Sequence, residues 1–119
     1  MPEGSHIVLL STSQCTATTV QPGYLLYNTT KGAIEQMTRV MAKDLARKGI
    51  VVNAVAPGPT GTDLFYEGKS EQMLKMIANL SPFGRIGKPE EIAEAIAFLS
   101  GGQSSWISGQ ILKANGALA

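Results

Sequence analysis

The stretch Ile50-Val51-Val52-Asn53-Ala54-Val55-Ala56 is apolar at every position but one, and Pro57-Gly58-Pro59 ends it abruptly. A short apolar run without polar alternation is typical of a strand that is covered on both faces of a parallel sheet. Shorter runs of similar character lie at residues 6–10 and 110–114. The sequence therefore predicts three strands, with residues 50–56 as the best defined of them.

The segments between these strands show helical periodicity. One helix carries Ile34, Met37, Met41 and Leu45 at steps of three and four residues, and it ends at Gly49. A second covers about residues 70–80, and a third begins at Lys88-Pro89-Glu90-Glu91, where proline and acids suit a first turn. The alternation of strands and helices predicts an α/β fold with a parallel sheet. Three strands make a poor complete sheet, so we expect the chain to be part of a larger one.

The composition of the 119 residues excludes several classes of function. The net charge of +1 provides no basic field for nucleic acid, and no apolar run approaches the roughly 20 residues that span a bilayer. Cys15 is the single cysteine and His6 is the single histidine. These counts exclude an internal disulfide and a metal site rich in cysteine or histidine. The first residues lack the plan of a signal peptide. We expect a cytoplasmic protein without metal, membrane or nucleic-acid partners.

A phenol and an ammonium group, those of Tyr27 and Lys31, are four residues apart and lie on one helix face. Ser13 follows the first strand, and the carboxyl ends of parallel strands are where ligands bind. A phenol is a poor acid or base at neutral pH, but a nearby cation favours its ionised form. On its own such a pair is more often structural.

Four motifs that follow one another along the chain nevertheless form a specific set. They are HIVLLSTS at residues 6–13, YNTTKGA at 27–33, GIVVNAVAPG at 49–58 and GQILKANG at 109–116. From about residue 6 to the end, the chain resembles the second half of the classical short-chain dehydrogenase/reductase family, and its carbonyl reductases in particular. The resemblance implies the C-terminal part of a Rossmann-type, doubly wound parallel sheet with flanking helices. Residues 1–119 would then form a partial NAD(P)-binding domain without the N-terminal dinucleotide-binding half. The implied activity is hydride transfer between a nicotinamide cofactor and a carbonyl or secondary alcohol.

The resemblance also implies roles for individual residues. Tyr27 is similar to the catalytic acid/base, and Lys31 to the residue that binds the nicotinamide ribose and assists the tyrosine. Ser13 resembles the serine that orients the substrate, with Ser11 and Thr12 as nearby alternatives. The cofactor-binding segment is matched by residues after the second strand, namely Pro57, Gly58, Thr60 and Thr62.

The expected substrate lid covers residues 63–80. Gln14, Phe65 and Tyr66 are candidate substrate contacts, whereas Met73 and Met76 fit a pocket wall and a core equally well. The few charges of the lid favour a neutral, cyclic or aromatic carbonyl as substrate. The resemblance implies NADP or NAD as cofactor, with a slight preference for NADP.

Members of this family commonly form dimers or tetramers, so we expect a homo-oligomer. Trp106 and Ile107 are then expected to pack in the core or at a subunit interface. The glycine-rich phosphate-binding turn is not among residues 1–119, and Asn115-Gly116-Ala117 departs from the Gly-Gly usual in the family. An alternative is therefore a truncated, non-catalytic remnant that serves as an oligomerisation or binding module.

Overall fold

The computed structural model describes all 119 residues and contains one three-stranded parallel sheet. Its strands are β1 (His6–Leu10), β2 (Val51–Pro57) and β3 (Ile111–Ala114), and β2 lies between the other two. His6 pairs with Val51 at one end of the sheet, and Pro57 pairs with Ala114 at the other. Residues 52–56 of β2 are buried, as a strand covered on both faces requires. The predicted strands and the parallel sheet are confirmed.

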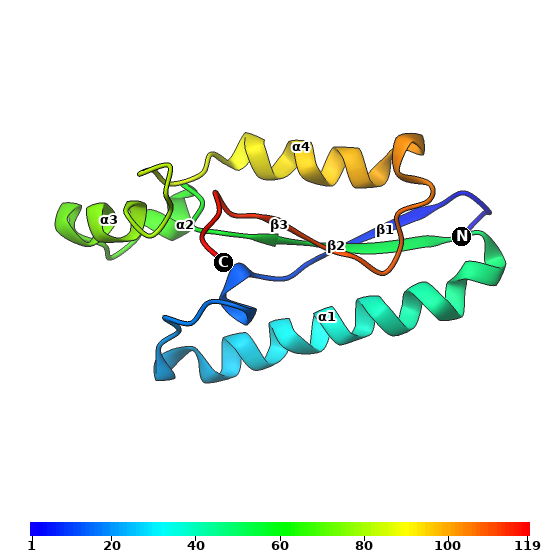
Figure 1. Cartoon of the computed structure of the whole chain (residues 1–119), viewed down its shortest axis with the longest axis horizontal. Helices are drawn as coiled ribbons and strands as arrows, with labels where there is room; N and C mark the ends of the chain where they lie inside the picture. Colours follow the sequence, from blue (N-terminus) through cyan, green and yellow to red (C-terminus); the bar gives the residue numbers. More distant parts are fainter.

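Helices cover both faces of the sheet. Figure 1 shows α1 (Leu25–Leu45) along one face and α4 (Pro89–Ser100) along the other. Two shorter helices, α2 (Asp63–Tyr66) and α3 (Glu71–Ala78), lie together beyond the carboxyl end of β2 (Figure 1). This arrangement places the expected lid next to the sheet edge where the candidate site was predicted.

Helix α1 ends as predicted, and its inward face includes residues outside the predicted apolar stripe. Gly49 closes the turn after it with φ 68°, a left-handed conformation that glycine adopts without steric cost. Its buried residues are Thr38 and Ala42, whereas Met37 is 44% exposed. Met41 and Leu45 of the predicted stripe pack against the core, whereas Met37 lies outside it. Thr38 is tolerated inside because its hydroxyl donates to the carbonyl of Ile34 at 2.8 Å.

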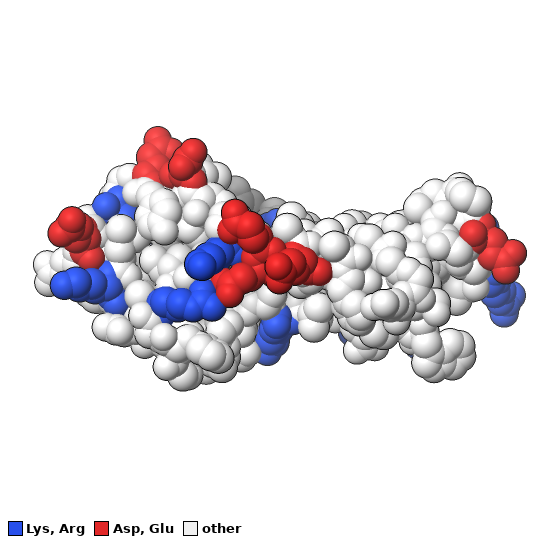
Figure 2. Space-filling model, turned by 90° about the horizontal axis from the view of Figure 1, so that it is seen from above, with Lys and Arg blue, Asp and Glu red and all other residues white.

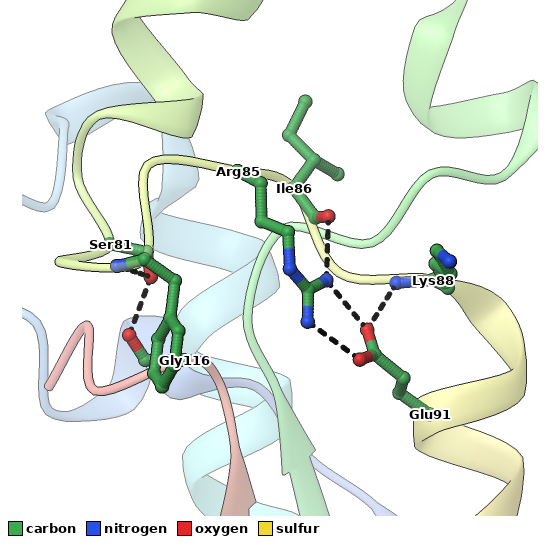
Figure 3. Close-up of polar contacts among 7 residues, drawn as sticks. Ser81, Arg85, Ile86, Lys88, Glu91 and Gly116 are labelled. Carbon is green, nitrogen blue, oxygen red and sulfur yellow. Dashed lines mark hydrogen bonds and ion pairs between the residues drawn. The ribbon is translucent and has the colours of Figure 1, made fainter.

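Helix α4 begins at a hydrogen-bonded cap. The Glu91 carboxylate accepts from the main-chain N–H of Lys88 at 2.8 Å and from both terminal nitrogens of Arg85 at 2.7 and 2.9 Å (Figure 3). The Arg85 hydrogen bonds, followed by the Lys88 N–H, lower the pKa of Glu91 to about 2. The predicted start of this helix at the Lys-Pro-Glu-Glu segment is confirmed, with Lys88 as its N-cap.

The molecule is elongated, measuring 49 × 27 × 23 Å. Trp106 is 98% exposed, so a core position for this side chain is excluded. Acidic and basic side chains are interspersed on the α4 face shown in Figure 2. None of the helices combines the length and the apolarity that crossing a membrane demands.

Candidate active site at the carboxyl edge of the sheet

The segment after β1 places three hydroxyl groups in different environments. Ser11, Thr12 and Ser13 are all buried. The Ser11 hydroxyl donates to the Glu35 carboxylate on α1 at 2.7 Å, and the Thr12 hydroxyl accepts from the N–H of Gln14 at 3.3 Å. Ser13 donates to the carbonyl of Ala56 at 2.9 Å, which holds it at the carboxyl end of β2. Among the three alternatives, Thr12 and Ser13 line the large pocket at this edge and Ser11 does not.

Helix α1 brings Tyr27 and Lys31 to the same edge. The Lys31 ammonium nitrogen lies 5.8 Å from the centre of the Tyr27 ring and donates to the carbonyl of Leu10, the last residue of β1, at 3.0 Å. The Tyr27 side chain is 44% exposed and lines the same pocket as Ser13. The predicted pair is thus on one face of α1, with the phenol open to a ligand and the ammonium anchored to the sheet.

The loop after β2 supplies the third side of the pocket. Pro57, Gly58 and Thr60 line it, and the Thr60 hydroxyl donates to the carbonyl of Gly58 at 2.8 Å. Two main-chain hydrogen bonds of 2.9 Å hold the loop against Gly87. Thr62 lies outside the lining: its hydroxyl accepts from the N–H of Phe65 at 3.2 Å and caps α2.

The pocket has a volume of about 520 Å³, and one of its walls is largely apolar. Phe65 lines this pocket, together with four apolar residues of the helix predicted over about residues 70–80, namely Met73, Met76, Ile77 and Leu80. The structure therefore places the two methionines in the pocket wall and not in a closed core. Tyr66 lies elsewhere, because its hydroxyl is against the backbone of Gly61.

The polar groups of the pocket are mostly uncharged. No carboxylate is among the lining residues, and the single cation is Lys69, which donates to the carbonyl of Phe65 at 2.6 Å. Gln14 also lines the pocket, and its side-chain oxygen is buried and accepts no hydrogen bond. The hydroxyls of Ser13, Tyr27 and Thr60 complete the polar side, and those of Ser13 and Thr60 donate to the carbonyls of Ala56 and Gly58. The pocket thus combines a mostly uncharged polar side with an apolar wall.

Two residues near the C-terminus belong to the site although sequence reasoning missed them. Leu118 lines the pocket, and the Asn115 amide nitrogen donates to the Ser13 hydroxyl at 3.0 Å. Asn115 directly follows β3, so the rule that selected Ser13, a polar residue at the carboxyl end of a parallel strand, selects Asn115 as well. The signal was present in the sequence and was interpreted only as a departure from Gly-Gly.

Comparisons with known proteins cover almost the whole chain. A family model described as enoyl-(acyl carrier protein) reductase matches residues 1–118. An NADPH-dependent aldehyde reductase-like protein of Arabidopsis thaliana chloroplasts is 40% identical over 95% of this chain and 41% of the relative. A short chain dehydrogenase family protein from Francisella tularensis superposes with a TM-score of 0.88 at 34% identity, covering 98% of this chain and 52% of the other.

A ketoreductase with bound NADP, which acts at C-6 of angucyclines, superposes with a TM-score of 0.87 at 33% identity. The superposition covers 99% of this chain and 45% of the ketoreductase. The chain therefore spans about half the length of the proteins that it matches.

Proposed function

Because the chain belongs to the short-chain dehydrogenase/reductase family, we propose that it carries the proton-transfer side of an NAD(P)-dependent oxidoreductase site. The reaction is hydride transfer between a nicotinamide cofactor and a carbonyl or secondary alcohol. The observation that carries this proposal is one pocket, free of carboxylates, that is lined by Ser13, Tyr27 and the Pro57-Gly58 turn. Residues 1–119 would form the C-terminal part of the NAD(P)-binding domain.

The proposed roles are those that the family resemblance implies, and the positions of the polar atoms support them. In the reducing direction Tyr27 gives its phenolic proton to the substrate oxygen, and in the oxidising direction it accepts that proton. The Lys31 ammonium, next to the Tyr27 ring, stabilises the phenolate that remains. Ser13 donates a hydrogen bond to the same substrate oxygen and orients it. A nicotinamide cofactor, when bound, would supply or accept the hydride, and the Pro57-Gly58 turn and Thr60 would hold its nicotinamide end.

The pocket wall supports an apolar, cyclic or aromatic carbonyl as substrate. Phe65, Met73, Met76 and Leu80 present aromatic and flexible apolar surface opposite the polar side of the pocket. Turnover restricted to highly charged sugar phosphates would contradict this assignment. NADP is the proposed cofactor, since one relative is described as NADPH-dependent and one structural neighbour holds NADP.

The first experiment combines calorimetry with a turnover assay on the purified chain. We expect NADPH to bind more tightly than NADH and turnover by the chain alone to be weak. In whatever assembly is active, we expect Tyr27→Phe to lower turnover about a hundredfold or more while cofactor binding and folding persist. Tyr66→Phe is the matched control, because it removes a phenol oxygen that lies outside the pocket. Equal turnover in Tyr27→Phe and the unmodified chain would remove Tyr27 from the proposed role.

The same experiment separates the enzyme from the alternative of a non-catalytic module. Binding and turnover by the chain would mean that it forms a working cofactor site, alone or by self-association. A folded chain that neither binds NADPH nor turns over a carbonyl would support the oligomerisation or binding module.

A further inference from the structure

The side chain of Asn115 connects the end of β3 with the candidate catalytic serine. Its amide nitrogen donates to the Ser13 hydroxyl oxygen at 3.0 Å and to the main-chain oxygen of Ala119 at 3.1 Å. The Ser13 hydroxyl in turn donates to the carbonyl of Ala56 at 2.9 Å, and Ser13 is only 1% exposed. A buried hydroxyl is thus held between one donor and one acceptor.

The orientation of the Asn115 amide follows from its two partners. Both are acceptors, because the Ser13 proton points to Ala56 and the main-chain oxygen of Ala119 has no proton to donate. Only the NH₂ end of an amide satisfies two acceptors, so an inverted Asn115 would bring oxygen against oxygen. Asn115 is therefore a donor to Ser13 in this arrangement.

The backbone of Asn115 is fixed with respect to the same site. Gly58 donates its N–H to the carbonyl of Ala114 at 3.0 Å. The Cα and Cβ atoms of Asn115 lie against Gly58, where a Cβ on the glycine would come within 2.9 Å of both. The amide that contacts Ser13 is therefore attached to the turn that also lines the pocket.

We propose that Asn115 is a positioning residue for Ser13, an inference that rests on the proposed oxidoreductase function. Asn115 holds the Ser13 oxygen through one lone pair, while the hydroxyl proton is donated to the carbonyl of Ala56. When a carbonyl substrate enters, that proton turns from the carbonyl of Ala56 to the substrate oxygen while the serine oxygen stays in place. Without the Asn115 donor, the serine side chain can rotate away from the productive geometry.

Steady-state kinetics and a double-mutant cycle test this role. Asn115→Ala is expected to lower kcat about tenfold and to leave the dissociation constant of the cofactor unchanged. Asn115→Asp, which keeps the shape but cannot donate, is expected to be equally impaired. In the Ser13→Ala background, removal of Asn115 should have no further effect, because the residue acts through the serine. Additive losses in the double variant would overturn the proposal.

Ser81→Ala is the matched control for loosening of the C-terminal segment. The Ser81 hydroxyl donates to the carbonyl of Gly116, one residue after Asn115, at 2.6 Å (Figure 3). It makes no hydrogen bond to Ser13. Because the two serines share no partner, we expect kcat of Ser81→Ala to stay within about twofold of the unmodified chain. A loss equal to that of Asn115→Ala would show that anchoring of the segment, and not the donor to Ser13, is responsible.

Nuclear magnetic resonance provides a readout that does not depend on activity. In ¹⁵N-labelled protein, Ser13→Ala should shift the side-chain amide signals of Asn115 and speed their exchange with water, while the exposed Asn79 amide stays unchanged. Unchanged Asn115 signals would overturn the proposal. Failure of the proposed function is distinguishable, because it appears as absent turnover in the unmodified chain with the Asn115 response intact.

Discussion

At Gly58 the site depends on the absence of a side chain. A Cβ there would lie 2.9 Å from both Cα and Cβ of Asn115, and the backbone atom cannot move aside like the end of a flexible side chain. We predict that Gly58→Ala destabilises the chain by about 1–3 kcal/mol, because the turn and the segment after β3 must separate. Chemical denaturation followed by circular dichroism measures the change.

Gly32→Ala is the control for this prediction. Gly32 lies within α1, and a Cβ at that position meets no atom within 4 Å. Since alanine is the better helix former, this variant should be more stable by about 0.5–1 kcal/mol. Equal denaturation midpoints for Gly58→Ala and the unmodified chain would show that the close approach of Asn115 is relieved without cost.

Single residues also show how far the sequence could predict the site. Tyr27 and Lys31 followed from a helical spacing, and Ser13 from its place after a strand, because these relations are local. The rule that selected Ser13 also places Asn115 at this edge, because Asn115 directly follows β3. The contact between the two residues, 102 positions apart, could not be predicted in this way. The lining role of Leu118 is equally non-local, since it depends on the path of the chain after β3.

At the scale of elements, the cap of α4 links a lowered pKa to stability. The pKa of Glu91 falls from its ordinary 4.5 to about 2, chiefly through the hydrogen bonds from Arg85 and then through the Lys88 N–H. A carboxyl group whose pKa is lower in the folded state stabilises the fold above pH about 4.5, and this stabilisation is lost as the pH falls toward 2. We predict that Glu91→Gln lowers the melting temperature at pH 7. The difference in melting temperature between this variant and the unmodified chain should disappear as the pH falls from about 4.5 toward 2.

Thermal melts between pH 7 and pH 2.5 measure the closing difference. Glu90→Gln is the matched control, because Glu90 lies in the same first turn and makes no side-chain hydrogen bond there. Its melting temperature should follow that of the unmodified chain more closely at every pH. The prediction would be contradicted if Glu91→Gln lowered the melting temperature by the same amount at pH 7 and at pH 2.5.

The order and type of the main elements were predictable, but some of their details were not. The run at residues 50–56 predicted β2 because both faces of the strand are covered and no polar residue interrupts the pattern except Asn53. In α1, the apolar period indicated a helix but not which of Met37 and Thr38 turns inward, because the hydroxyl of a threonine can be satisfied by its own helix. The short helix α2 was missed, although Thr62 and Asp63 form an ordinary N-cap and first turn.

At the scale of the whole molecule, the chain is less compact than its length suggests. Its radius of gyration is 15.5 Å, whereas a compact domain of this length has about 13–14 Å. Both outer strands of the sheet, β1 and β3, pair on one side only. The open shape leaves apolar side chains on α1 exposed, and these form a stripe of Leu26, Met37 and Val40 at helical spacing.

This stripe carries the prediction of self-association. Exposed apolar stripes of this kind are commonly covered by protein, and the proposed homo-oligomer would cover this one with a second copy. We expect the sedimentation coefficient of the chain to rise with concentration. The Val40 side chain is 66% exposed, and Val40→Lys places a charge there, so we expect this variant to have a sedimentation coefficient closer to that of the monomer. Glu94→Gln on α4 changes the net charge by the same amount and should leave the association unchanged.

If the unmodified chain stays monomeric at high concentration, the homo-oligomer prediction fails. If it associates equally well with Lys at position 40, the contact lies elsewhere, and the exposed Trp106 is then the next surface to test.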